Sequence, residues 1–262
     1  MAYRSDVGSM LYLAGLGLCS SDIPSRTLEI LRGKELYIES YTSFIPDETI
    51  ALIKRTTGND LIKLSRSDLE ERVIELIKKA RSKEIVLLVG GDPLIATTHK
   101  IILNEAKKQG VDIEVLHAPS ILSAAIGESG LDFYRFGQII TIPRWSEHYK
   151  PISFYEIIEG NAKRGLHSLL LLDYDSDKRS SLQPAQAIDI LMSAEMHYKS
   201  GIVNEGTNII VLHNISLDDK LVKYVSLDEA RSLSFDYGPT LVMLPGKLSE
   251  IELETLKNSV TE

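Results

Sequence analysis

Two glycine-rich segments follow apolar runs in the first half of the sequence, and they hold the residues best suited to bind a ligand. Gly15-Leu16-Gly17-Leu18 closes the first run, and Gly90-Gly91-Asp92-Pro93 closes a later one. Glycine lets the chain turn sharply and brings backbone amides close to a ligand. Asp92 can accept hydrogen bonds from the hydroxyl or amino groups of such a ligand. The alternative is that Asp92 only starts a turn, as Asp-Pro often does.

The first glycine pair does not complete a dinucleotide-binding fingerprint. The pattern G-x-G-x-x-G needs glycine at position 20, where this chain has Ser20. Glu39 ends the next apolar run, but nothing else there resembles the usual ribose-binding arrangement. An ordinary Rossmann site is therefore not favoured, and a plain strand–turn–helix joint stays open as the interpretation of Gly15 and Gly17.

Other common chemistries find little support in the residue types. The chain contains neither a G-x-S-x-G nor a Walker A sequence. Cys19 is the only cysteine, so no disulfide forms within the chain, which fits a reducing cytoplasm. We expect no metal site, because the histidines form no close pair with ligand spacing; they are His99, His117, His148, His167, His197 and His213.

Composition indicates an ordinary globular protein. The 262 residues are 44% hydrophobic and 25% charged, enough for two small α/β domains. A formal net charge of -8 argues against a nucleic-acid partner. No apolar run approaches the roughly 18–20 residues that a membrane helix needs, so no membrane partner is expected. The polar segment Met1–Ser9 lacks the apolar core of a signal peptide, and the first predicted domain begins after it, at Met10.

Short apolar runs alternate with helical patterns up to about residue 117. Predicted strands cover 10–14, 35–39, 84–89 and 112–117, and predicted helices cover 23–32 and 97–109. Another helix is expected after Ser67-Asp-Leu-Glu70, which has the pattern of a capping box, with Leu69, Val73, Leu76, Ile77 and Ala80 on one face. This alternation predicts a mainly parallel sheet.

Ala118-Pro119 interrupts the alternation, and we place the domain boundary there, giving domains 10–118 and 119–262. In the second domain the strands lie closer together, which predicts a mixed sheet. Its strands are expected at 138–142, 167–173, 208–213, 221–225 and 240–244, and its helices at 154–163, 184–198, 227–233 and 250–259. Segments 144–151 and 176–183 are polar connections. The predicted fold class is α/β with two domains.

Several segments together resemble the tetrapyrrole methylase superfamily and, within it, the diphthine synthase family. The resemblance is collinear from Met10 onward and is carried by Leu11–Leu18, Glu39–Ser43, Gly91–His99, His117–Ile121, Phe136-Gly137, Arg164–His167 with Leu172-Asp173, and Pro245–Leu248. Gly-Asp-Pro alone is shared by many relatives, whereas Ala-Thr-Thr-His and His-Ala-Pro-Ser-Ile are more specific. The chain departs from the pattern at Gly90, where proline is frequent.

The resemblance implies a cytoplasmic homodimer that binds S-adenosylmethionine in a cleft between the two domains. It also implies methylation of translation elongation factor 2, at the amino group of an aminocarboxypropyl-modified histidine. Three transfers would give diphthine, with S-adenosylhomocysteine as the other product. By position, the implied cofactor-binding residues are Leu18, Asp92, Ile95, Ser120, Ile121, Leu172, Ile215 and Thr240. No catalytic residue is assigned at this stage.

Two other functions stay open on the residues alone. A methylase of corrin or porphyrin precursors would also carry the Gly-Asp-Pro loop, but it needs several basic residues for a macrocycle of carboxylates. Few lie near the motifs here, chiefly Lys100 and Arg144. The third possibility is a non-catalytic module that binds S-adenosylmethionine, because no visible catalytic side chain is required.

Overall fold

The computed structural model describes residues 10–259, so the expectation for Met1–Ser9 lies outside the described residues. The chain divides into two compact units between Leu122 and Ser123. Helix α6 (Ile121–Glu128) contains this division. Within the described residues, no helix is both long and apolar enough to cross a membrane.

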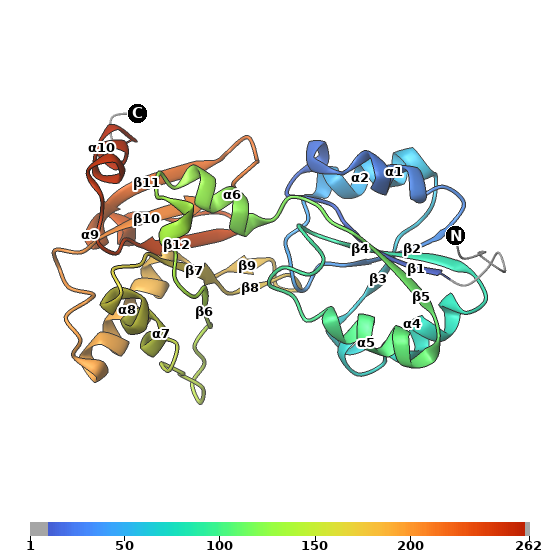
Figure 1. Cartoon of the computed structure of the whole chain (residues 1–262), viewed down its shortest axis with the longest axis horizontal. Coiled ribbons are helices and arrows are strands. Elements are labelled where there is room, and N and C mark those ends of the chain that lie inside the picture. Colours follow the sequence, from blue (N-terminus) through green and yellow to red (C-terminus); the bar gives the residue numbers. More distant parts are fainter. Residues whose placement is uncertain (1–9, 260–262) are drawn as a thin grey trace. The chain divides into compact units, whose positions relative to one another are not determined.

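The first unit is built on a five-stranded sheet in which every pairing is parallel, as predicted. The strand order is β3-β2-β4-β1-β5. The strands are β1 (Met10–Gly15), β2 (Glu35–Glu39), β3 (Ile62–Leu64), β4 (Glu84–Val89) and β5 (Asp112–Leu116). Helices α1 (Ser25–Ile30) and α2 (Asp47–Thr57) cover one face, and α4 (Val73–Ala80) and α5 (Lys100–Gln109) cover the other (Figure 1).

Strands β1 and β4 lie inside the sheet and are almost entirely apolar, because helices cover both of their faces. Along β1, Leu11 and Leu13 join the cluster that includes side chains of α4 and α5. Tyr12 and Ala14 point the other way, into the cluster with α1 and α2. This double burial fixes the register of β1 against β4, where Gly15 pairs with Val89.

The second unit has a five-stranded mixed sheet, also as predicted, in the order β11-β10-β12-β7-β6. Only the β6–β7 pair is parallel. The strands are β6 (Ile140–Ile142), β7 (Ser168–Leu172), β10 (Asn208–His213), β11 (Leu221–Ser226) and β12 (Thr240–Leu244). Helices α7 (Tyr155–Lys163), α8 (Pro184–Tyr198) and α9 (Leu227–Ser232) pack around one core cluster, and α10 (Glu250–Ser259) lies with α6 on the other face (Figure 1).

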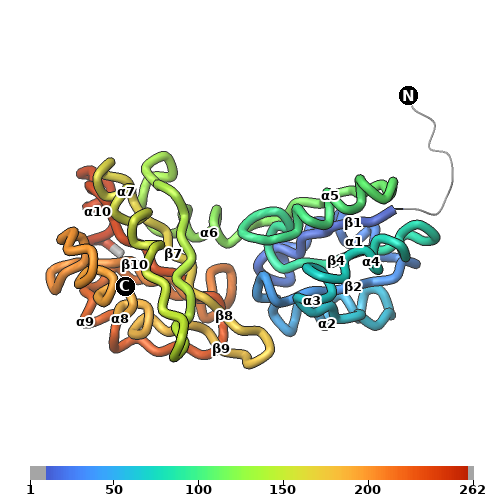
Figure 2. The backbone as a smooth tube through the Cα atoms, turned by 90° about the horizontal axis from the view of Figure 1, so that it is seen from below, coloured from blue at the N-terminus to red at the C-terminus, as the bar shows by residue number. Residues whose placement is uncertain are grey.

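Two local predictions were wrong in detail, and one predicted connection contains a short strand that was not predicted. The capping box is formed by Ser65 with Asp68 at α3 (Arg66–Glu70), not by Ser67 with Glu70, and α3 is separate from α4. Helix α5 begins at Lys100 rather than at residue 97: the residues before it form a turn in which Ala96 has φ +54° and the Thr97 hydroxyl and His99 ring bond back to the Pro93 carbonyl. The polar connection 176–183 contains half of a short hairpin, β8 (Tyr174–Asp175) with β9 (Ser180–Ser181), which stands out from the second unit in Figure 2.

Candidate functional site

The glycine loops lie at one edge of the first unit's sheet. Because β1, β4 and β5 are parallel, their carboxyl ends meet there, which is where open α/β sheets bind ligands. Gly17 and Gly91 are joined by two backbone hydrogen bonds. The Gly91 amide donates to the Gly17 carbonyl at 2.8 Å, and the Gly17 amide donates to the Gly91 carbonyl at 3.3 Å. The loops after β1 and β4 therefore form one continuous backbone surface.

Gly15 is required by the close approach of three segments. A Cβ atom at Gly15 would lie 2.6 Å from the Gly91 carbonyl oxygen and 2.7 Å from the Cβ of Ala118. The situation at Gly91 is different, since a Cβ there would meet only the Pro119 carbonyl oxygen, at 3.9 Å. Open space beside a glycine with φ +66° is what a ligand held against bare backbone requires. The residues at this edge thus fit a bound cofactor.

Asp92 holds the loops together from within. Asp92 is only 6% exposed. One carboxylate oxygen accepts the Leu94 amide at 2.9 Å, which is the turn-forming role considered from the sequence. The other oxygen accepts Nδ1–H of His117 at 2.7 Å and the Ala118 amide at 3.3 Å. Asp92 therefore connects the loop after β4 to the segment after β5, which a simple turn residue would not do.

A second layer of buried polar groups supports the Asp92 loop. His99, which is 1% exposed, donates from Nδ1 to the Pro93 carbonyl at 2.9 Å. Glu39 is fully buried and accepts the backbone amides of Tyr41 and Thr42 at 2.9 and 3.1 Å. His99 Nε2 lies 3.4 Å from a Glu39 carboxylate oxygen without forming a well-aligned hydrogen bond. Glu39 and His99, each from a family motif, thus support the Asp92 loop from beneath its outer surface.

Five of the eight predicted cofactor residues belong to this edge. Leu18 is partly exposed, and its amide donates to the Asp22 carboxylate at 3.1 Å. Ile95 is 42% exposed, so its apolar side chain is accessible at this edge. Ser120 accepts the Leu122 amide at 3.3 Å, so it caps α6, and Ile121 is the first residue of that helix. The structure therefore brings these four residues and Asp92 to the carboxyl ends of β1, β4 and β5.

The other three predicted residues lie together at one edge of the second unit's sheet. Leu172 ends β7, and Thr240 begins the neighbouring antiparallel strand β12. Thr240 pairs in turn with His213 at the end of β10, two residues before Ile215. All three are buried, with Leu172 8%, Thr240 4% and Ile215 1% exposed. Their side chains present little surface, so any ligand contact at Ile215 would involve mainly the backbone.

The two polar connections of the second unit meet at this same edge of its sheet. The Arg144 amide donates to Asp173 at 3.4 Å, and the Arg144 guanidinium donates to the Ser180 carbonyl at 3.2 Å. The Arg179 guanidinium lies over the ring of Tyr237, 5.1 Å from its centroid. The Arg144 guanidinium thus holds the β8–β9 hairpin against the segment that follows β6, and Arg179 holds it against the segment before β12.

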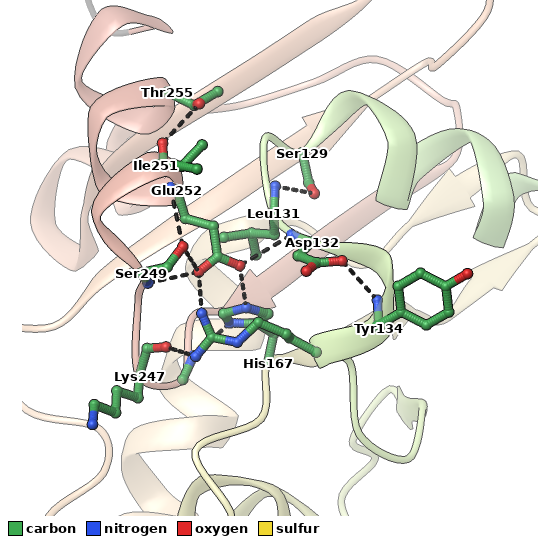
Figure 3. Close-up of polar contacts among 12 residues, drawn as sticks. Ser129, Leu131, Asp132, Tyr134, His167, Lys247, Ser249, Ile251, Glu252 and Thr255 are labelled. Carbon is green, nitrogen blue, oxygen red and sulfur yellow. Dashed lines mark hydrogen bonds and ion pairs between the residues drawn. The ribbon is translucent and has the colours of Figure 1, made fainter.

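Several family motifs lie at the opposite edge of the second sheet, in a buried network shown in Figure 3. His167, fully buried just before β7, donates from Nε2 to Glu252 at 2.8 Å and accepts the Gly246 amide on Nδ1 at 2.9 Å. Glu252 also accepts the backbone amides of Ser249 and Asp132 and pairs with Arg135. Burial favours the neutral acid, but these donors outweigh it and lower the pKa of Glu252 to about 2. The network fastens α10 to the sheet, and it is not part of the candidate site.

A hollow at the amino-terminal edge of the first sheet offers no comparable chemistry. It is lined by Gly33, Lys34, Glu35, Asn59, Lys83 and Glu84, among others. Its lysines are already paired, Lys34 with Glu84 at 3.0 Å and Lys83 with Glu35. In the part of the chain that the structure describes, no three potential metal-ligating side chains converge. We therefore assign the candidate site to the carboxyl edge of the strands.

Comparison with known proteins identifies the class of enzyme. Residues 10–230 match the family model described as Tetrapyrrole (Corrin/Porphyrin) Methylases. The fold and this match define a methyltransferase. Diphthine synthases of Methanocaldococcus jannaschii and Methanothermobacter thermautotrophicus are 37% and 35% identical to this chain. The first alignment covers 95% of this chain and 98% of the relative, and the second covers 94% of each.

Solved structures agree with the sequence relatives. A crystal structure titled putative diphthine synthase from Entamoeba histolytica has a TM-score of 0.84 at 31% identity, covering 96% of this chain and 98% of that one. A structure titled diphthine synthase has a TM-score of 0.85 at 30% identity and covers 97% and 96%.

The chain belongs to the diphthine synthase family of tetrapyrrole methylases. The predicted family, fold class and methyltransferase activity are thereby confirmed. Its place as an S-adenosylmethionine-dependent methyltransferase of diphthamide biosynthesis follows from the family. The corrin or porphyrin methylase and the non-catalytic module are not favoured, because the similarity to diphthine synthases spans nearly the whole chain.

Proposed function

We propose that the protein methylates translation elongation factor 2, on the amino group of a histidine that already bears an aminocarboxypropyl arm. Three successive transfers from S-adenosylmethionine would give diphthine and S-adenosylhomocysteine. The observation that carries this proposal is the packed edge at Gly15, where the Gly91-Asp-Pro and His117-Ala-Pro-Ser motifs are joined through Asp92. The Gly-Asp-Pro loop, which many relatives share, thus meets a motif that is more specific to diphthine synthases.

We assign cofactor contacts to residues at the ligand-binding edge of each sheet. In the first unit the open backbone at Gly91 would receive the polar part of the cofactor, beside the exposed apolar side chain of Ile95. The proposed contact residues of the first unit are Leu18, Asp92, Ile95, Ser120 and Ile121. Those of the second are Leu172, Ile215 and Thr240.

For this reaction the protein mainly needs to position its two substrates and remove water from around them. S-adenosylmethionine would supply a methyl group bonded to a positively charged sulfur. The protein must present the amine nitrogen in line with that bond, and the nitrogen must be neutral to attack. Buried loop supports such as Glu39 and His99 would keep the Gly-Asp-Pro loop rigid enough for this alignment.

The proposed partner is a macromolecule, so the site must admit an exposed segment of it. We propose that residues 144–151 and the β8–β9 hairpin border the entrance, since both follow strands that end at the edge with Leu172. Lys178 is 79% exposed at the tip of this hairpin. We further propose a cytoplasmic homodimer, as the family resemblance implies.

The direct test is methyl transfer from labelled S-adenosylmethionine to elongation factor 2 that carries the aminocarboxypropyl histidine. We expect label on that histidine only, and none on factor lacking the arm. Binding of S-adenosylmethionine is measured in parallel by calorimetry. If the cofactor binds and the modified factor acquires no label, the proposed substrate is wrong.

A further inference from the structure

His117 is an exposed imidazole fixed at one end by a buried carboxylate. Its Nδ1 atom lies 2.7 Å from the Asp92 carboxylate, while its side chain is 67% exposed. The residue follows β5 directly, at the edge where the proposed cofactor loops meet. Asp92 is itself held by two backbone amides, so it provides a rigid support for the ring.

This contact determines which ring nitrogen carries the proton. A carboxylate can only accept hydrogen bonds, so Nδ1 of His117 must be the donor. In the neutral imidazole the other nitrogen, Nε2, then has a free lone pair. No hydrogen bond or ion pair involving Nε2 of His117 occurs among residues 10–259. The ring is therefore oriented as a proton acceptor, in the way that a carboxylate orients a catalytic histidine.

Other ionisable groups at this edge are unsuited to take a proton from a substrate. Glu39 and His99 are buried, and Cys19 is 8% exposed. The Asp22 carboxylate accepts the Leu18 amide, and Asp92 is covered by three donors. Among these groups, His117 alone combines an exposed ring with a nitrogen that has no partner.

We propose that His117 is the general base that takes a proton from the substrate's amino group before each methyl transfer. The proposal rests on the proposed function, because it presumes an amine substrate. An aliphatic amine is mostly protonated at neutral pH and cannot attack in that form. Imidazole is the side chain best matched to accept a proton near neutrality.

The nitrogen must lose one proton before each methyl transfer. An N–H bond of the ammonium breaks, and its proton moves to Nε2 of His117, leaving the electron pair on the amine nitrogen. That pair forms the C–N bond as the methyl carbon separates from sulfur, and the C–S bonding pair stays on sulfur. The product nitrogen again carries a positive charge and, after the first two rounds, a removable proton. His117 releases its own proton to solvent between rounds.

The test uses His117→Asn, because the asparagine amide can still donate to Asp92 but cannot accept a proton. We expect kcat to fall on the order of a hundredfold at neutral pH, with calorimetric affinity for S-adenosylmethionine nearly unchanged. The rate should recover as the pH is raised, because solution then deprotonates the amine. His197→Ala, an exposed histidine on α8, is the matched control and should retain the wild-type rate.

The outcomes separate the base from the function on which it rests. A wild-type protein that leaves the modified factor unmethylated would contradict the proposed function itself. Wild-type activity together with an equally active His117→Asn overturns the role of His117 as base. So does a variant that loses cofactor affinity, or one whose rate stays low at every pH, since either result indicates a structural role.

Discussion

Two histidine–carboxylate pairs in this protein have hydrogen bonds of nearly the same length but differ in the exposure and partners of the ring. His167 and Glu252 lie 2.8 Å apart at the far edge of the second sheet, and His117 and Asp92 lie 2.7 Å apart at the candidate site. His167 is fully buried and accepts the Gly246 amide on Nδ1, so its proton is on Nε2 and no lone pair remains. His117 has the other tautomer, and its unused nitrogen belongs to an exposed ring.

The partner of the second ring nitrogen distinguishes a supporting histidine from one that can react. A pair whose ring nitrogens both have protein partners contributes to stability and is closed to a substrate. A pair that leaves one nitrogen unused on an exposed ring can exchange protons. Variants of the His167–Glu252 pair should therefore lose stability, whereas variants at the candidate site should lose ligand binding or activity.

Glu252→Ala should have the largest effect, and it should fall on stability. The change leaves Arg135 and His167 without their buried acceptor, which costs about 3–5 kcal/mol in the free energy of unfolding. Chemical denaturation measures this loss, with the exposed Glu254→Ala on the same helix as a control near zero. Folded Glu252→Ala should bind S-adenosylmethionine normally, and weakened binding would make the network part of the site.

The same network should make the second unit sensitive to acid. The pKa of Glu252 is about 2 in the folded protein against an ordinary value of 4.5. Its stabilisation is therefore complete above about pH 4.5 and is lost as the pH falls toward 2. Burial also lowers the pKa of His167, whose contribution declines as the pH falls below its ordinary value of 6.5. The stability gap between wild type and Glu252→Ala should narrow through this acidic range.

Gly15→Ala should act on the site rather than on the network. A methyl group there would contact the Gly91 carbonyl and Ala118 at distances that neither can tolerate, so the loops must separate. We expect cofactor affinity to fall by more than about a hundredfold, roughly 3 kcal/mol. Gly160→Ala is the matched control, since a Cβ there meets nothing within 4 Å. Normal binding by Gly15→Ala would exclude this edge as the cofactor site.

Asp92→Asn should produce an intermediate effect that links both sides of the comparison. Three N–H groups converge on this carboxylate, and an amide cannot accept all of them in the same way. Cofactor binding should weaken by roughly 1.5–3 kcal/mol, on the order of tenfold to a hundredfold. Calorimetry with exposed Asp60→Asn as the control measures this, and equal affinities would return Asp92 to the role of a turn residue.

Charge reversal at Lys178 and Arg179 should give the smallest effect. If the β8–β9 hairpin borders the entrance, the double change to glutamate should raise KM for elongation factor 2 severalfold and leave cofactor affinity intact. The control is Lys163→Glu, an exposed lysine on α7. Unchanged KM for the factor would remove the hairpin from the proposed interface.

Much of the fold was predictable because its signals are local. Burial on both faces makes 84–89 a nearly continuous apolar run, so the bounds of β4 were predicted correctly. The apolar face with Leu76, Ile77 and Ala80 also packs in the core as expected. Strand β3 gave no such signal, since two of its three residues are exposed at the sheet's edge. The turn before α5 includes Ala96, whose positive φ no residue pattern indicates.

The positions of the loops at the candidate site could be predicted from the sequence, but the side-chain contacts between them could not. The Gly-Asp-Pro loop could be placed after one strand and His117 at the end of another, and parallel strands bring such ends to one edge. The hydrogen bond between Asp92 and His117 joins residues 25 positions apart and depends on side-chain geometry. Equally, nothing in the sequence distinguished His167 from His117, because the distinction lies in the partner of the second ring nitrogen.

The most direct test of the account is mass spectrometry of the target histidine after reaction. Elongation factor 2 bearing the aminocarboxypropyl arm is incubated with S-adenosylmethionine and the wild-type protein, digested, and the modified peptide is fragmented. We predict three methyl groups, all on the amino nitrogen, and little product with His117→Asn at neutral pH. Methyl groups on another residue, or an unmodified peptide despite bound cofactor, would contradict the account.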